Sequence, residues 1–88
     1  MTSSIFVTLH NKEGAFLRSI GVAERRGFKV TEAHLQPETD NRLRLELRLE
    51  ARGGTLAVLA RQLERLHDVI GVSCEGASWA SPKVAEAV

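Results

Sequence analysis

The 88-residue chain lacks several features that specialised proteins need. Its one cysteine, Cys74, excludes an internal disulfide framework and a multi-cysteine zinc site. Aromatic residues make up only 5%, too few for a platform that stacks bases, and no apolar run reaches the roughly 18–20 residues that span a bilayer. Neither sign of charge dominates, since 12 Lys and Arg residues stand against 11 Asp and Glu. We therefore expect neither nucleic acid nor a membrane as a partner.

The length allows one domain, with little room for an enclosed active site. A domain this small leaves much of its surface exposed, so we expect it to self-associate as a homodimer. Residues 1–10 carry neither the basic start nor the cleavage pattern of a signal peptide, which predicts a cytoplasmic location. Binding or regulation is favoured over catalysis.

Hydrophobic periodicity predicts six elements. Alternation of apolar and polar residues indicates four strands, at Ser4–His10, Phe28–Gln36, Arg42–Glu50 and Val69–Cys74. Apolar residues at spacings of three and four indicate two amphipathic helices, at Ala15–Arg26 and Leu56–His67. The order β-α-β-β-α-β predicts an α+β, ferredoxin-like fold, with two helices on one face of a four-stranded antiparallel sheet.

The segment 42–50 has the clearest pattern in the chain. Four leucines alternate with Arg44, Glu46 and Arg48, so one face of this strand should be buried and the other charged. Phe6 and Thr8 are expected on the same charged face of the sheet. That face is either solvated or a docking surface for a partner.

The second expected strand alternates less cleanly. Phe28 and Val30 fall on one face, and Ala33 and Leu35 then fall on the other. The slip indicates a bulge or twist at residues 31–32, or a strand covered on both faces.

Turn-forming residues mark the element ends. Residues 37–41 predict a hairpin loop, and Gly27 predicts a left-handed end to the first helix. Thr55 is placed to cap the second helix. On the first helix, Phe16, Ile20 and Ala23 fall on one face, with Leu17 beside them.

Catalytic and metal-binding motifs are missing. His10, His34 and His67 do not match any spacing typical of metal ligands, and no Gly-rich phosphate loop or nucleophile motif is present. We therefore expect no catalytic residue, metal or cofactor, and a small enzyme is the least supported alternative.

The turn Asn11–Gly14 is the most informative segment. Gly14 stands where a strand passes into a helix, and the N–H groups of Ala15, Phe16 and Leu17 should point outward there. Such groups favour a carboxylate or phosphate, and Asn11 can donate or accept beside them. An ordinary turn would use the same residues, so both interpretations stay open.

Two segments resemble the ACT domain, and more narrowly the regulatory small subunit of bacterial acetolactate synthase. Residues 6–28 are similar to that family in Asn-x-x-Gly-Ala at the loop, in Arg-x-Ile-Gly on the helix and in Arg-Gly-aromatic at its exit. Residues 62–69 resemble its Gln-Leu-x-Lys-Leu-x-Asp-Val segment. The resemblance covers about residues 5–74.

The resemblance implies a non-catalytic regulatory subunit. It would bind and activate the thiamine-diphosphate-dependent large subunit of acetolactate synthase, with valine feedback in some members. ACT domains bind small effectors, usually amino acids, at the interface between paired domains. By position in the family's pattern, the effector-binding residues here would be Asn11, Gly14, Ala15, Phe16, Lys29 and Val30.

One position departs from the family's pattern. Valine-responsive members usually have Asn where this chain has Lys29, and a lysine cannot both donate and accept as an amide does. The length is that of the short form, with an ACT-like domain at residues 1–75 and a tail at 76–88, in which Trp79 is the one expected anchor. The alternative is a stand-alone amino-acid-binding ACT module that regulates another enzyme or a transcription factor.

Overall fold

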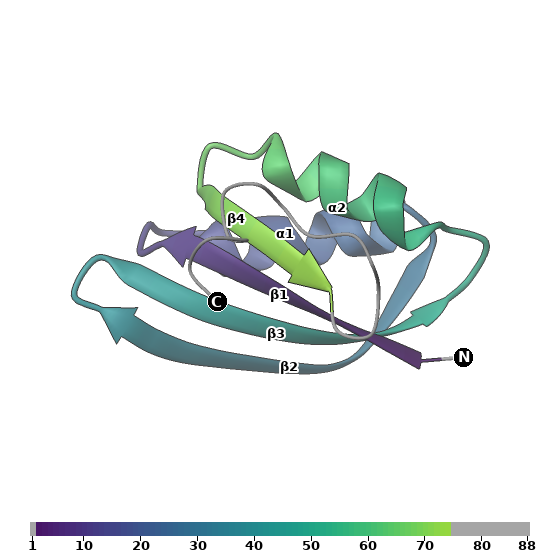
Figure 1. The fold of residues 1–88 in the computed structure, drawn as a ribbon, viewed down its shortest axis with the longest axis horizontal. Helices are drawn as coiled ribbons and strands as arrows, with labels where there is room; N and C mark the ends of the chain where they lie inside the picture. The colour runs from purple at the N-terminus through teal and green to yellow at the C-terminus, as the bar shows by residue number, and fades with distance from the viewer. Residues whose placement is uncertain (1, 75–88) are drawn as a thin grey trace.

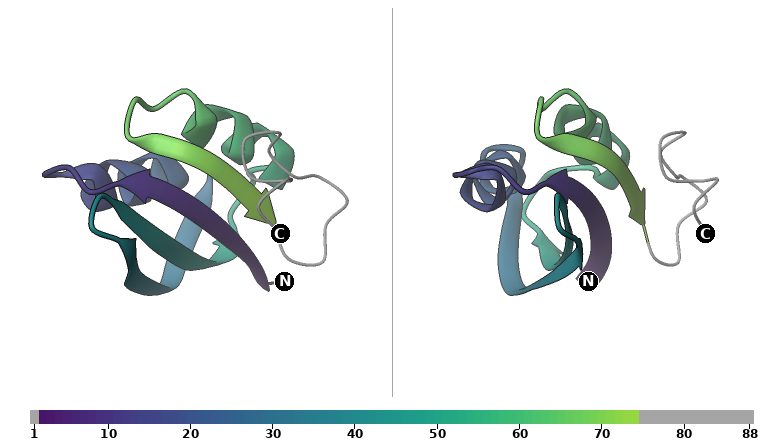
Figure 2. Two further views of the ribbon diagram at one scale, coloured as in Figure 1. Left: turned by 60° about the vertical axis from the view of Figure 1, so that its left-hand side comes forward. Right: turned by 90° about the vertical axis from the view of Figure 1, so that its left-hand side faces the viewer.

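The computed structural model describes residues 2–74 and contains all six expected elements in the expected order. They are β1 (Thr2–His10), α1 (Ala15–Arg25), β2 (Phe28–Thr39), β3 (Arg42–Ala51), α2 (Leu56–Glu64) and β4 (Val69–Cys74). The strands form one antiparallel sheet in the order β2-β3-β1-β4, so β2 and β4 are the edge strands (Figure 1). Figure 2 shows both helices on the same side of the twisted sheet. The predicted ferredoxin-like fold is confirmed, while the expected tail lies outside the described residues.

The core lies between the helices and the two central strands. Six side chains on one face of β1 and β3 are fully buried: Ile5, Val7, Leu9, Leu45, Leu47 and Leu49. Ile5 lies opposite Leu47 and Val7 opposite Leu45 across the ladder. Each buried side chain of this size stabilises the fold by about 1.5–3 kcal/mol. The alternation of leucine with charged residues in β3 therefore decides which face receives the helices.

Helix α1 packs on the sheet with the expected face, and Leu17 is the exception. Ala23 is buried and Phe16 and Ile20 are partly buried against the core, whereas Leu17 is 69% exposed. Ala15 and Ser19 are buried as well. Small side chains let the helix backbone come close to the leucine-rich sheet. The hydroxyl of Ser19 is satisfied within the helix, because it donates to the carbonyl of Ala15 at 3.0 Å.

Two element boundaries differ from the prediction. Helix α2 ends at Glu64 rather than His67, because the chain tightens there: the amide of Arg65 bonds the carbonyl of Gln62 at 3.2 Å. Strand β2 continues through Pro37 to Thr39, so the hairpin turn is shorter than residues 37–41. A proline is tolerated there because β2 is an edge strand.

The predicted irregularity in β2 is a bulge. The pairing with β3 shifts register between Val30 and Glu32, which returns Ala33 and Leu35 to the helix-facing side. The side chains of Glu32, His34 and Gln36 then lie on the open face. Every residue from 31 to 39 is exposed, so β2 is not covered on both faces.

Candidate functional site

The expected loop lies at the end of the sheet where β1 passes into α1. Gly14 has a φ of 81°, the left-handed region that favours glycine, and stands at the N-cap of α1. The amide of Ala15 donates to the carbonyl of Lys12 at 3.1 Å, so the expectation of a free N–H at Ala15 is wrong. The amides of Phe16 and Leu17 have no acceptor within residues 2–74. These two groups are available to a ligand.

An ion pair between Arg18 and Asp68 lies beside this loop. Nε of Arg18 donates to Oδ2 of Asp68 at 2.6 Å, and Nη2 donates to the carbonyl of Glu13 at 2.9 Å. The Asp68 side chain is 8% exposed, while that of Arg18 is 50% exposed. The hydrogen bond from Arg18 holds the pKa of Asp68 below its usual value, against the opposing effect of burial. The amide of His10 also donates to the carbonyl of Asp68 at 2.7 Å.

The Arg18 guanidinium lies directly against the glycine. A Cβ built on Gly14 would be 2.6 Å from Nη1 of Arg18. Two unbonded helix amides and a half-exposed guanidinium, itself paired with Asp68, therefore share one small region at the positive end of the α1 dipole. This arrangement suits a carboxylate.

A hollow of about 490 Å³ adjoins the loop. We call it the loop-end hollow, and its lining residues are His10, Asn11, Lys12, Asn41 and Arg42. They come from the end of β1, the loop after it and the tip of the β2–β3 hairpin. Asn11, expected at the effector site, is thus one of the residues that line this hollow.

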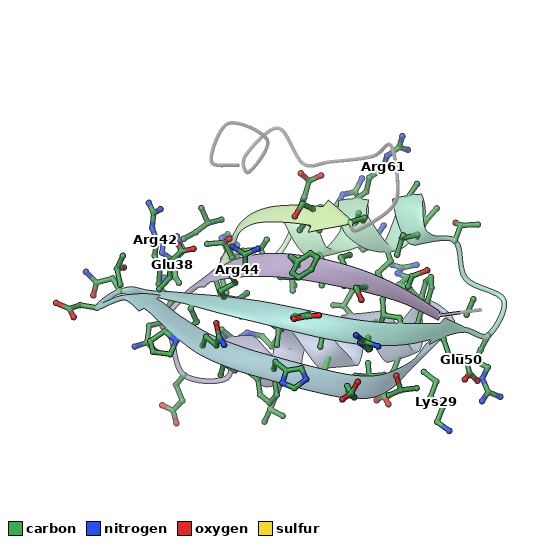
Figure 3. The ribbon with its side chains drawn as sticks, turned by 60° about the horizontal axis from the view of Figure 1, so that its bottom comes forward. Lys29, Glu38, Arg42, Arg44, Glu50 and Arg61 are labelled. Atoms are coloured by element: carbon green, nitrogen blue, oxygen red, sulfur yellow. The ribbon has the colours of Figure 1, made fainter. Side chains whose placement is uncertain are left out.

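Lys29 and Val30 lie at the opposite end of the sheet. Val30 pairs with Leu49, whereas Asn11 follows His10, which pairs with Arg42. Leu49 follows Arg42 by seven positions on β3, about 23 Å of strand. Figure 3 shows Lys29 and Arg42 at the two ends. The structure brings together four of the six expected residues, Asn11, Gly14, Ala15 and Phe16, but not Lys29 and Val30.

Sequence reasoning missed Arg18 and Asp68 at this site. The position of Arg18 offered a signal, because it follows Gly14 by four residues and helical side chains lean toward the N-terminus. Asp68 offered none, because 50 residues separate it from Arg18.

A second concave surface lies on the open face of the sheet. A groove of about 300 Å³ is lined by residues of both charge signs: Glu32, His34, Gln36, Arg44, Glu46 and Arg48. Nε of Arg48 lies 3.4 Å from Oε1 of Glu32, and the guanidinium of Arg44 lies 5.3 Å from the Phe6 ring centroid. The predicted charged face is confirmed, and its charges are partly paired within the chain.

Catalytic chemistry finds little support in the described part of the chain. Burial raises the pKa of the Cys74 thiol to about 11, which leaves it a poor nucleophile. No group of three or more His, Cys, Asp and Glu within residues 2–74 could hold a metal ion. No helix among the same residues has the length and hydrophobicity to cross a membrane.

Comparisons with known proteins agree with this fold. A family model described as ACT domain matches residues 11–72. The structure is similar to the solution structure of the ACT domain from GTP pyrophosphokinase of Chlorobium tepidum, with 18% identity, a TM-score of 0.70 and 88% of each chain covered. It is also similar to the C-terminal domain of the MgtC protein from Mycobacterium tuberculosis, with 18% identity and a TM-score of 0.67, over 90% of this chain and 85% of that one. No curated protein sequence matches the chain.

Proposed function

The chain belongs to the ACT-domain family of regulatory amino-acid-binding modules, and on that premise we propose that it is a regulatory subunit of acetolactate synthase. It binds an amino-acid effector, performs no catalysis itself and activates the thiamine-diphosphate-dependent catalytic subunit in the cytoplasm. The resemblance of residues 6–28 and 62–69 to that family supports the choice of enzyme. The loop geometry supports the effector.

One observation carries the effector site: the unbonded amides of Phe16 and Leu17 beside Asn11. An amino-acid carboxylate accepts from these two N–H groups and lies close to the Arg18 guanidinium, which is held at Gly14. The Asn11 amide can then bond either polar group of the effector.

The homodimer completes this site in the proposal. Within residues 2–74, the outer edge of β2 has no strand partner and its residues 31–39 are all exposed, and exposed edges invite pairing with another chain. Antiparallel pairing of two β2 strands about the point between Ala33 and His34 sets Val30 of a second copy opposite Pro37. Pro37 lies at the loop end of the sheet, where it pairs with Leu43. Lys29 and Val30 of one copy would thus approach the Asn11 loop of the other.

A thermal melt with each of the twenty amino acids tests the effector site. A ligand at 100 times its dissociation constant stabilises by about 2.7 kcal/mol, a rise of roughly ten degrees or more for a domain of this size. We expect a selective rise with valine, leucine or isoleucine. Asn11→Ala should abolish it, while Asn41→Ala, the same substitution in the neighbouring turn, should leave it unchanged. A flat panel would contradict effector binding.

Activation is tested by adding the purified chain to the catalytic subunit of its organism and measuring the rate. Charge reversal on the open face, Glu46→Arg, should weaken activation if that face docks the enzyme. Arg61→Glu on α2 controls for a change of charge elsewhere. An unchanged rate at excess chain, together with a selective amino-acid shift, would instead assign a stand-alone module that regulates another protein.

A further inference from the structure

The loop-end hollow has a lining that can supply several hydrogen-bond donors. Lys12 and Arg42 carry fixed positive charge, Asn11 and Asn41 offer side-chain N–H groups, and the fifth lining residue is His10. No carboxylate is among these lining residues. This lining differs from the open-face groove, where acidic and basic side chains alternate.

Backbone hydrogen bonds hold the walls of the hollow in place. The amide of Asn11 donates to the carbonyl of Asn41 at 2.8 Å, which joins the β1–α1 loop to the hairpin tip. His10 pairs with Arg42 across the β1–β3 ladder, and the amide of Lys12 donates to the carbonyl of His10 at 2.8 Å. A ligand would therefore meet a site whose backbone is already arranged.

Size and charge narrow the ligand class. The volume of about 490 Å³ falls within the range of about 300–1,000 Å³ that small-molecule sites occupy. A carboxylate brings one negative charge and two acceptor oxygens, whereas a phosphoryl group brings up to two charges and three oxygens, a better match to two cations and two amides. The hollow is a single depression, and a nucleic-acid backbone would need a longer basic track.

We propose that the loop-end hollow binds a phosphoryl dianion, carried by a small phosphorylated metabolite or present as free phosphate. Lys12 and Arg42 lie on two sides of the anion, and the side chains of Asn11 and Asn41 donate to its oxygens. The inference goes beyond the proposed function, because it uses Lys12, Asn41 and Arg42 rather than the helix amides of Phe16 and Leu17, and the two sites share only the Asn11 side chain.

Titration of the ¹⁵N-labelled chain followed by NMR tests the site. The probes are inorganic phosphate and glycerol 3-phosphate, each added at constant ionic strength with chloride. We expect saturable shifts confined to residues 10–12 and 41–42. Tighter binding of glycerol 3-phosphate assigns a phosphorylated metabolite, and equal binding assigns free phosphate. Shifts that do not saturate, or that spread equally to Arg61 of α2, overturn the proposal.

Matched variants separate this site from a general effect of charge. Lys12→Gln and Arg42→Gln should each weaken phosphate binding by about tenfold, the loss expected for one charge-assisted hydrogen bond. Both side chains are exposed, so the fold should survive. Arg61→Gln removes the same charge from α2 and should have no effect (Figure 3). Equal weakening by all three variants would overturn the proposal.

The two proposals can fail separately in the same spectra. Valine should shift the amides of Phe16 and Leu17, whereas phosphate should shift the residues of the hollow. Loss of the valine response alone would contradict the effector site, and loss of the phosphate response alone would contradict the anion site.

Discussion

The two turns that flank α1 both need a left-handed glycine, yet different neighbours crowd them. At Gly14, with a φ of 81°, the atom that a new Cβ would meet is the end of the flexible Arg18 side chain. At Gly27, with a φ of 88°, a Cβ would lie 2.7 Å from the backbone nitrogen of Gly54. The carbonyl of Gly27 accepts from the amides of Arg52 and Gly54, at 2.7 and 3.2 Å.

This contrast divides the molecule into a fixed end and an adjustable end. Where backbone packs on backbone, neither partner can move without breaking hydrogen bonds of the fold. Where the end of a side chain provides the contact, a small shift of that end relieves it, and at Gly14 the contact atom is Nη1 of Arg18, while Nε and Nη2 bond Asp68 and Glu13. The adjustable end also holds the unbonded amides and the loop-end hollow. Ligand binding is therefore expected at the end where a side chain, and not the backbone, provides the packing contact.

The largest expected effect is at the fixed end, with Gly54→Ala. A Cβ there would lie 2.1 Å from the carbonyl oxygen of Arg26 and 2.8 Å from the Phe28 ring, so backbone must shift. We expect the free energy of unfolding to fall by about 3 kcal/mol, measured by urea denaturation. Gly53→Ala is the control, because no atom of the non-neighbouring residues that the structure describes lies within 4 Å of its Cβ, and only its φ of 100° is strained. Equal losses in both variants would contradict the packing argument.

At the adjustable end, Gly14→Ala should cost less. The left-handed backbone strains a non-glycine residue by about 1–2 kcal/mol, and relief of the contact needs only a small shift of Nη1 of Arg18 rather than of backbone. Urea denaturation should therefore place this variant between wild type and Gly54→Ala. A loss as large as that of Gly54→Ala would show that the Arg18 contact is as fixed as the backbone contact at Gly54.

Self-association should depend on the exposed half of β2. Leu35 is 42% exposed there, and a charge at this position disfavours burial against a second copy. We expect Leu35→Asp to weaken the dimer by about tenfold or more in sedimentation equilibrium. Val58→Asp is a matched control, since Val58 is 45% exposed on α2, away from the β2 edge. Equal dissociation by both variants would contradict β2 pairing.

The smallest expected effect concerns acid stability. Arg18 lowers the folded-state pKa of Asp68. The Asp68–Arg18 pair therefore contributes its full stabilisation of the fold above the unfolded pKa near 4, and this stabilisation is lost as the pH falls through the folded-state pKa. Asp68→Asn should therefore lose less stability than wild type between pH 5 and pH 2. Arg18→Gln should likewise reduce the fall in the free energy of unfolding between pH 5 and pH 2, measured by urea denaturation at each pH. If the stability of Arg18→Gln fell with pH as steeply as that of wild type, Arg18 would not be the cause of the lowered pKa of Asp68.

Local patterns predicted most of the fold. The alternation of leucines in β3 fixed both the strand and its buried face, because side chains alternate with a period of two. The rotation of α1 about its own axis could be predicted from the sequence only in part. Phe16, Ile20 and Ala23 pack against the core as predicted, but Leu17 is apolar yet 69% exposed and Ser19 is polar yet buried.

The candidate site was predictable only in part. Asn11 and Gly14 belong to one short turn, so their proximity follows from the chain itself. Arg18 and Asp68 meet only because the β4 edge folds back beside β1, a contact that no local pattern contains. Lys29 and Val30 came from the family resemblance, and a single copy does not bring them to the loop.

The one-residue bulge of β2 between Val30 and Glu32 changes which positions of the strand face the helices. Before it, even-numbered positions such as Phe28 and Val30 face the helices; after it, odd-numbered positions such as Ala33 and Leu35 do. A deletion of Thr31 would exchange the two sides of the hairpin arm while leaving its composition almost unchanged. A single inserted residue thus decides which side of that arm is polar. Sequences of relatives with a longer or shorter β2 must therefore be aligned separately before and after the bulge.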